Sequence, residues 1–257
     1  MPAVPLSDRL AIWAGLALIT ILAWVYLLRM PMSAGMQMAS MPNMPAGMAM
    51  AMQPQSWTLG DTITAFAMWA VMMVAMMIPS ASPMVMLYAR SIGASGSSSK
   101  FKVAIFVAGY IVAWTIFSAG ATLIQLSLQK ASLISGDLTV GSLIGGAILV
   151  LAGIYQLTPL KQVCLRHCQS PIGFFMAHWR EGTAGALSMG LRHGFFCVGC
   201  CWMLMALLFV AGVMNLLWVA LIAIFVLIEK VLPWGRMTSS VTGLALVCAG
   251  LWIAVIR

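Results

Sequence analysis

Long runs of apolar residues alternate with short polar segments along most of the chain. Seven runs stand out: Leu10–Leu28, Thr62–Ile78, Val103–Leu126, Val140–Leu157, Phe195–Val213, Leu216–Ile228 and Val241–Ile256. A helix needs about 20 mostly apolar residues to cross the hydrocarbon core of a bilayer, whereas barrel strands are shorter and alternate in polarity. The pattern therefore predicts an all-α, polytopic transmembrane helical bundle of about seven spans, or six if Leu216–Ile228 does not cross.

The composition agrees with a bilayer environment. Of the 257 residues 63% are hydrophobic and only 7% are charged, and the mean hydropathy is +1.04. Soluble domains carry about a quarter charged residues, so a soluble domain is excluded. The first apolar run is too long for a signal-peptide core, and no small-residue cleavage site follows it. We therefore interpret residues 1–29 as a retained N-terminal membrane anchor helix.

The distribution of basic residues predicts the orientation. With a cytoplasmic N-terminus, ten of the 13 Lys and Arg residues lie on the inner side, and only Arg29, Lys130 and Arg257 lie outside. This asymmetry follows the positive-inside rule. The net charge of +8 is explained in this way, and because no basic stripe with interleaved aromatic residues occurs, we expect no nucleic-acid partner.

Residues 30–56 form a low-complexity segment on the predicted outer side. It contains nine of the 23 methionines, together with Pro, Ala and Gly: Met30, Met32, Met36, Met38, Met41, Met44, Met48, Met50 and Met52. Such a composition does not form a packed core. We expect an extracytoplasmic loop here, followed by a helical bundle over residues 57–257 with a cytoplasmic Cys/His-bearing loop at residues 158–194.

Two cysteine groups are the main candidates for chemistry. Cys164, His167 and Cys168 lie at positions i, i+3 and i+4, and Cys197, Cys200 and Cys201 repeat this spacing. On a helix each group shares one face, and both lie at the inner end of the bundle, where they can face each other. Thiolate and imidazole ligands favour copper(I) or zinc over magnesium or calcium. Thiol redox chemistry and simple packing of small cysteines stay open as alternatives; we interpret the isolated Cys248 as a packing residue.

Methionines form a second candidate group in Thr62–Ile78. Met68, Met72 and Met76 recur at every fourth position, with Met73 and Met77 beside them. Their thioethers are neutral, soft ligands that suit copper(I). Methionine is also a flexible filler of helix cores, so a structural interpretation of this stripe stays open.

Other polar residues have structural interpretations. Thr58 and Asp61 match a capping box at the start of the second span. Glu229 and Lys230 close the sixth span, where we interpret them as an interfacial ion pair. His178 and Glu181 are three residues apart, and either extend a metal site or stabilise a helix in the loop. No nucleotide loop, nucleophile elbow or pair of carboxylates suited to hydrolysis occurs, which argues against a hydrolase or an ATP-driven pump.

Three long stretches carry a resemblance to a known family. They are "MWAVMMVAMMIPSASPMVMLYAR", "YQLTPLKQVCLRHCQSP" and "GLRHGFFCVGCCWMLMALLFVAGVMNLLWVALIAIFVLIEKVLP". The chain from residue 57 to 233, with the trailing span, resembles a family of bacterial integral membrane proteins of unknown function that are described as predicted metal-binding. The resemblance implies a polytopic membrane protein that binds metal. It carries over the positions Cys164, His167, Cys168, His193, Cys197, Cys200 and Cys201, and it does not include the Met-rich loop.

These observations favour a soft-metal protein of the bacterial cytoplasmic (inner) membrane, with copper(I) preferred and zinc as the alternative. Outer methionines would collect the ion, the Met68–Met77 stripe would line a path, and the inner Cys/His groups would hold or deliver it. An enzymatic role is less favoured. The alternatives are a membrane thiol–disulfide oxidoreductase that uses Cys197 and Cys200, and a non-catalytic scaffold subunit. Expected partners are the lipid bilayer, the metal ion, a metallochaperone or another membrane protein, and a second copy of the chain.

Overall fold

The computed structural model describes residues 5–39, 58–93, 97–131, 133, 140–232 and 234–256. In these residues the regular structure is α-helical, as the apolar runs predicted. The helices are α1 (Leu6–Ala39), α2 (Leu59–Ser91), α3 (Ser97–Lys130), α4 (Ser142–Leu157), α5 (Pro159–Gln169), α6 (Pro171–His178), α7 (Gly182–Ala206), α8 (Leu208–Ala211), α9 (Leu216–Val231) and α10 (Gly235–Ile256).

Five helical segments of the described chain are long and apolar enough to cross a membrane: Leu6–Met30, Leu59–Ser91, Ser98–Lys130, Gly182–Ala211 and Gly235–Ala254. A sixth is added if α4 and α5, which meet at a bend of 64°, are counted as one span. The predicted sixth span corresponds to α9, which has only 16 residues. The described residues thus contain five or six candidate spans, so a seventh span is not confirmed, whereas six lies within the predicted range.

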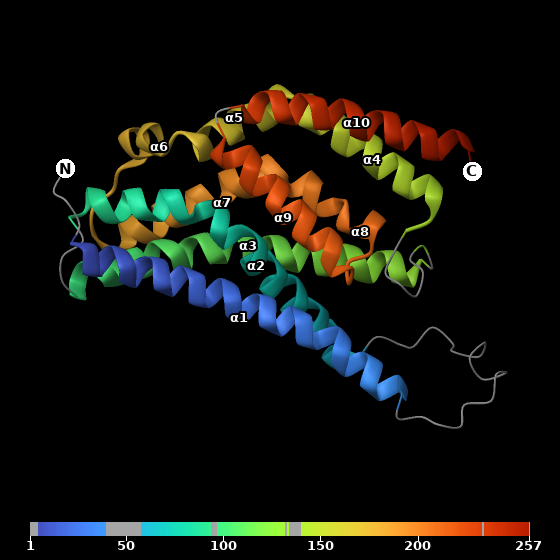
Figure 1. The fold of residues 1–257 in the computed structure, drawn as a ribbon, viewed down its shortest axis with the longest axis horizontal. Helices are drawn as coiled ribbons and strands as arrows, with labels where there is room; N and C mark the ends of the chain where they lie inside the picture. Colours follow the sequence, from blue (N-terminus) through green and yellow to red (C-terminus); the bar gives the residue numbers. More distant parts are fainter. Residues whose placement is uncertain are drawn as a thin grey trace.

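The helices form two packed groups (Figure 1). In the first group α1 packs along α2, α2 along α3, and α3 along α7. In the second group α4 and α10 lie side by side and run in opposite directions. Helix α9 contacts both α2 and α10, and α5 contacts α7, so these two helices connect the groups.

Glycines allow α3 and α7 to approach closely. A Cβ atom at Gly109 would lie 2.5 Å from the carbonyl oxygen of Leu187, and one at Gly190 would overlap the backbone of Phe106. Small residues at helix crossings are the usual means by which membrane helices pack, because lipid tails provide no hydrophobic force between helices. This contact fixes α7, which carries three of the cysteines, against the rest of the bundle.

A similar contact joins α4 to α10. Gly146 faces Gly250 and Gly153 faces Gly243, and a Cβ atom at Gly153 would lie 2.5 Å from the carbonyl oxygen of Gly243. Two glycines on each helix, seven residues apart, therefore form this second interface.

Helix α2 begins as the sequence predicted and ends later. The capping box is confirmed, because Thr58 Oγ1 accepts a hydrogen bond from the Asp61 N–H and the Asp61 carboxylate accepts one from the Thr58 N–H. The helix does not stop before Pro79, where the predicted span ended, but continues through Pro83 to Ser91. Pro83 lacks an N–H for the carbonyl of Pro79, and Ser82 Oγ donates to that carbonyl at 2.8 Å instead.

The segment 158–194, predicted as a loop, is largely helical. It contains α5, α6 and the first half of α7. Helix α7 begins at Gly182, thirteen residues before the predicted span, because the stretch "GTAGALSMGLRHG" is rich in small and polar residues that lower its hydropathy but still pack well in a helix.

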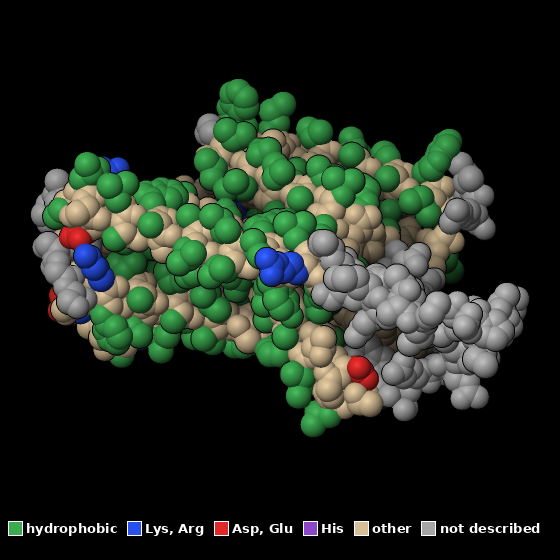
Figure 2. Space-filling view, turned by 60° about the horizontal axis from the view of Figure 1, so that its bottom comes forward, with side chains coloured by type: hydrophobic (Ala, Val, Ile, Leu, Met, Phe, Trp, Pro, Cys, Tyr) green, Lys and Arg blue, Asp and Glu red, His purple; other side chains and the backbone are tan. Residues whose placement is uncertain are grey.

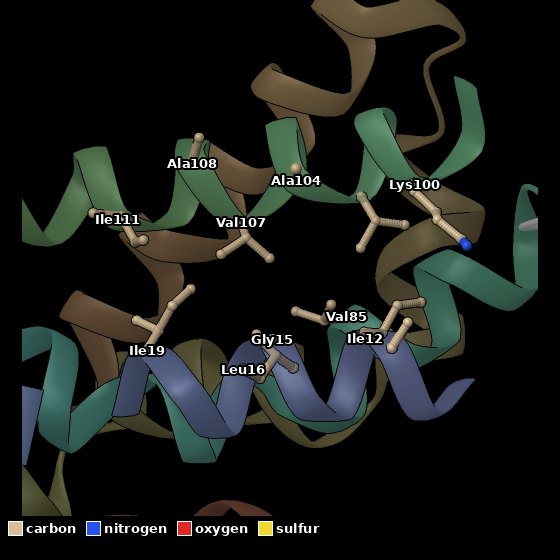
Figure 3. Close-up of a pocket in the computed structure, with 12 residues that line it drawn as sticks. Ile12, Gly15, Leu16, Ile19, Val85, Lys100, Ala104, Val107, Ala108 and Ile111 are labelled. Carbon is tan, nitrogen blue, oxygen red and sulfur yellow. The ribbon is translucent and has the colours of Figure 1, made fainter. Parts of the chain in front are cut away.

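The outer surface of the bundle is mostly apolar. Figure 2 shows one face covered largely by hydrophobic side chains, with few charged groups. Leu18, Leu22 and Leu123 are more than half exposed, as expected of residues that face lipid. An apolar groove of about 350 Å³ lies between α1, α2 and α3 (Figure 3), where Leu16, Val85 and Val107 line it. Lys100 closes one end of the groove and forms an ion pair with Asp8 at 2.7 Å.

Candidate metal centre

Helix α5 presents its Cys/His group to α7. Cys168 Sγ lies 4.0 Å from Cys200 Sγ, and Cys164 Sγ lies 2.9 Å from the position that a Cβ atom on Gly199 would occupy. The His167 ring stacks on Phe196 with ring centroids 4.2 Å apart. All three side chains therefore point to one face of α7, in agreement with the predicted i, i+3, i+4 arrangement.

The residues at the N-terminus of α5 determine where this helix begins and how it is oriented. Thr158 is the N-cap, its Oγ1 accepts a hydrogen bond from the Lys161 N–H, and Pro159 occupies the first helical position, where a missing N–H costs nothing. The preceding helix therefore ends at Leu157 and the chain turns by 64°. This turn brings the "CLRHC" stretch beside "CVGCC".

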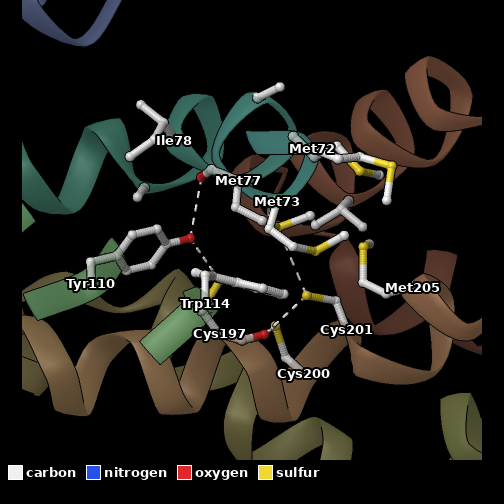
Figure 4. Close-up of a cluster of buried hydrophobic side chains, with 14 of the residues drawn as sticks. Met72, Met73, Met77, Ile78, Tyr110, Trp114, Cys197, Cys200, Cys201 and Met205 are labelled. Carbon is white, nitrogen blue, oxygen red and sulfur yellow. Dashed lines mark hydrogen bonds between the residues drawn. The ribbon is translucent and has the colours of Figure 1, made fainter. Parts of the chain in front are cut away.

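The cysteines of α7 contact two different sides of the bundle. Cys200 faces α5, whereas Cys201 Sγ lies 4.0 Å from Met77 Sδ on α2. Cys197 Sγ lies 2.9 Å from the hydroxyl of Tyr110 on α3. Cys197, Cys200 and Cys201 are each about 1% exposed. Figure 4 shows Met72, Met73, Met77 and Met205 gathered beside Cys201.

We name Met77, Cys168, Cys197, Cys200 and Cys201 the sulfur cluster. Two sulfur ligands that each lie about 2.3 Å from one ion are about 3.8 Å apart in tetrahedral geometry and up to about 4.6 Å apart in linear geometry. The Cys168–Cys200 and Cys201–Met77 distances of 4.0 Å fall in this range. The described residues contain no group of three or more His, Cys, Asp or Glu side chains already arranged around one point. The two sulfurs of each pair are therefore at a distance that allows both to bind one ion. A third His, Cys, Asp or Glu ligand would have to move closer to that ion, or a further methionine thioether would have to supply the third bond.

Lys230 lies inside the sulfur cluster, and the sequence pattern did not reveal this. Its Nζ is 2.8 Å from Cys197 Sγ, 3.2 Å from Ser80 Oγ and 3.9 Å from Met77 Sδ. The predicted interfacial pair of Glu229 with Lys230 is therefore wrong. Neighbouring residues on a helix point about 100° apart, so the two side chains reach different partners.

Glu229 belongs to a separate buried ion pair. Its Oε1 accepts a hydrogen bond from Lys161 Nζ at 2.6 Å, and neither side chain is exposed to solvent. Lys161 also donates to the side-chain oxygen of Gln156. The sequence placed Lys161 in an inner loop, because an isolated basic residue after an apolar run usually marks a membrane boundary.

The three histidines lie in an aromatic group next to the cluster. His193 is 3% exposed and its ring lies 5.5 Å from that of Tyr110, between centroids. The Nδ1 atoms of His167 and His178 lie 2.9 and 3.0 Å from the carbonyl oxygens four residues earlier. In a neutral ring this hydrogen bond places the proton on Nδ1 and leaves Nε2 as the ligand atom.

The predicted methionine stripe lies in the core. Met68, Met72 and Met76 are 5%, 1% and 1% exposed. Met77, which the spacing marked only as a neighbour of this stripe, is the α2 methionine whose sulfur contacts Cys201. The side chain of Met30 packs against the core. Met41, Met44, Met48, Met50 and Met52 lie outside the described residues, as do the side chains of Met32, Met36 and Met38.

A comparison with protein families finds a match to the family model PpoB2, described as copper chaperone, over residues 66–253. The matched region is about three quarters of the chain and includes the whole sulfur cluster and Lys230. No curated protein and no solved structure matches the chain. The sequence resemblance implied a metal-binding family without naming the metal, and this match names copper. Because this match covers more than half of the chain, the chain belongs to the family described as copper chaperone.

Proposed function

We propose that the protein is a multi-pass carrier of copper(I) in the bacterial inner membrane, and that the sulfur cluster is its cargo site. The observation that carries the proposal is that four sulfur atoms from three separate helices form two pairs, Cys168 with Cys200 and Cys201 with Met77, with 4.0 Å between the sulfurs of each pair. Met77, Cys200 and Cys201 are buried, and Cys168 is half-buried. Thiolates and thioethers are the ligands that copper(I) prefers, and zinc is the alternative ion for the thiolates.

The family description supports copper as the cargo. Copper chaperones hold the ion for delivery, so copper is the substrate of the proposed carrier and not a resident cofactor. In this proposal Cys168 and Cys200 hold the ion at one side of α7. Cys201 and Met77 hold it at the other side. His193, Cys164 and His167 surround the site and are the additional ligand candidates.

In this proposal the Met-rich segment 30–56 binds copper(I) first. Its nine methionines would collect copper(I) outside, and Met68, Met72 and Met76 would border the route to the cluster. Neutral thioethers bind a soft cation more weakly than thiolates do, so an ion that enters along thioethers is held more tightly when it reaches the cysteines. The N-terminus is proposed to be cytoplasmic, and the receiving partner to be a cytoplasmic metallochaperone or another membrane protein.

Metal analysis of the purified protein tests the proposed site. The chain is purified in detergent under reducing, chelator-free conditions, loaded with copper(I), and its metal content is measured by mass spectrometry. We expect about one copper per chain in the wild type and a loss in Cys168→Ser/Cys200→Ser/Cys201→Ser, which removes the thiols of both sulfur pairs. Cys248→Ser is the matched control, because Cys248 is exposed on α10 and lies outside the cluster. Full copper retention in the triple variant would contradict the proposal.

A second candidate function is favoured by the Cys168–Cys200 contact. Two thiols on different helices with sulfurs 4.0 Å apart can form a disulfide after a small movement. In a thiol oxidoreductase the two thiols would give two electrons and two protons to a quinone, leaving a disulfide and a quinol. A quinone-dependent loss of two reactive thiols, absent from Cys200→Ser, would support this function over copper carriage.

A further inference from the structure

The side chain of Lys230 ends among the sulfur atoms. Its Nζ contacts Cys197 Sγ at 2.8 Å, Ser80 Oγ at 3.2 Å and Met77 Sδ at 3.9 Å, and the residue is 6% exposed. An ammonium group has three N–H donors and no acceptor. The three contacts therefore match the three donors of a charged lysine.

The charge of Lys230 is not balanced by the neighbouring carboxylate. Glu229 is bound to Lys161 at 2.6 Å on a different side of α9. A buried charge needs a partner, because burial without one is costly. Among the three contacts of Lys230 only the sulfur of Cys197 can carry a negative charge. With Cys197 ionised, its sulfur and the ammonium form the charge pair of the cluster.

We propose that Lys230 makes the cluster selective for a monovalent soft cation over a divalent one. This inference rests on the proposed function, and it names the residue that decides which metal the site accepts. Thiolates by themselves bind zinc as well as copper(I), so the choice between them needs a further feature of the site. A fixed ammonium is such a feature, because its repulsion of a bound ion doubles when the charge of the ion doubles.

The distances make this repulsion strong. Lys230 Nζ lies 3.9 Å from Met77 Sδ, so an ion bound about 2.3 Å from that sulfur in the Cys201–Met77 pair lies within about 6 Å of the ammonium. At an effective dielectric constant of about 20, repulsion of a second positive charge at this distance lowers the affinity roughly a hundredfold. Ser80 Oγ holds the ammonium on the α2 side, so Lys230 is restrained beside the ion.

The test compares copper(I) and zinc affinities in the full-length, detergent-purified protein by competition with chelators. The variants are Lys230→Gln and Lys230→Arg, measured beside the wild type. Glutamine removes the charge, keeps a hydrogen-bonding amide and adds no soft ligand. Arginine keeps the charge. Lys100→Gln is the matched control, because Lys100 pairs with Asp8 beside the groove of Figure 3 and not with a sulfur atom.

We expect Lys230→Gln to raise the zinc affinity relative to the copper(I) affinity by roughly ten- to a hundredfold. Lys230→Arg and Lys100→Gln should keep the wild-type ratio. An unchanged ratio in Lys230→Gln, or an equal fall of both affinities, would overturn the inference and leave the proposed function standing. A wild-type chain that binds neither metal would overturn both.

A second variant covers the case in which Lys230→Gln fails to fold because Cys197 loses its partner. Cys197→Ser/Lys230→Gln removes both members of the charge pair and leaves two neutral groups that can bond to each other. The metal preference of this variant should shift towards zinc relative to Cys197→Ser alone. The same preference in both would overturn the inference.

Discussion

The ammonium of Lys161 and the carboxylate of Glu229 lie 2.6 Å apart, and neither side chain is exposed to solvent. The pair joins α5 to α9, and Gln156 at the end of α4 contacts the same ammonium. It therefore ties together the helices that carry Cys168 and Lys230. In lipid the alternative to this pairing is an uncompensated charge.

Lys161→Met should destabilise the protein strongly. The substitution leaves the Glu229 carboxylate buried without its cation, which costs about 3–5 kcal/mol in comparable buried pairs. The free energy of unfolding in detergent, monitored by the loss of the helical circular dichroism signal, measures the effect of the substitution. Lys100→Met breaks the Asp8 pair, in which the Lys100 side chain is 47% exposed, and should cost less than about 1 kcal/mol. Equal losses in the two variants would contradict the expectation.

Met77→Leu should weaken copper(I) binding and leave the fold intact. The substitution keeps the volume of a buried side chain and removes the thioether that lies 4.0 Å from Cys201 Sγ. We expect the affinity to fall by about tenfold or more, equivalent to about 1.4 kcal/mol. Met84→Leu is the control on the same helix, because Met84 is also buried and has no assigned place in the copper route, and it should bind copper(I) as the wild type does. A fall in Met84→Leu as large as that in Met77→Leu would assign the effect to packing.

Gly109→Ala should separate α3 from α7. A Cβ atom there would meet the carbonyl oxygen of Leu187 at 2.5 Å and the amide nitrogen of Leu191 at 2.8 Å. Because these are backbone atoms, the helices must move apart, at a cost of about 1–3 kcal/mol. Gly120→Ala on the same helix has open space around its Cβ position and should be neutral or stabilising by up to about 1 kcal/mol. Thermal unfolding should therefore occur at a lower temperature in Gly109→Ala, and at an unchanged or higher temperature in Gly120→Ala.

The proposed orientation can be tested at the two ends of α3. Ser98 and Ala131 are exposed at opposite ends of this helix. In a Cys248→Ser background, Ala131→Cys should react with a membrane-impermeant thiol reagent in intact cells, because it lies on the proposed outer side. Ser98→Cys should react only after permeabilisation. The reverse pattern would place the N-terminus outside.

The sequence predicted the helical class and the approach of the two cysteine groups, because both depend on local periodicity. Long apolar runs indicate helices that face lipid, and an i, i+3, i+4 spacing indicates that three side chains share one face of a helix. It did not predict that α2 continues through Pro79, since the hydrogen bond from Ser82 that satisfies the freed carbonyl is a detail of side-chain geometry. Nor did low hydropathy reveal the start of α7 at Gly182.

The roles of Lys230 and Met77 could not be predicted, because they depend on contacts between residues far apart in the chain. Lys230 meets Cys197 only after α9 has packed on α2 and α7. A basic residue next to an acidic one at the end of an apolar run is more often an interfacial pair. Likewise, five closely spaced methionines look alike in sequence, and the helix packing alone decides which of them reaches Cys201.

The two sulfur pairs lie on adjacent flanks of α7, because the consecutive residues Cys200 and Cys201 point about 100° apart and contact Cys168 and Met77 respectively. In the proposed function, an ion exchanged between the pairs would move between neighbouring faces of a single helix. The Cys201–Met77 pair provides a thiol and a thioether, and the Cys168–Cys200 pair provides two thiols. If the protein carries copper(I) as proposed, this difference in ligand strength would favour the ion at the pair of thiols over the pair that contains the thioether.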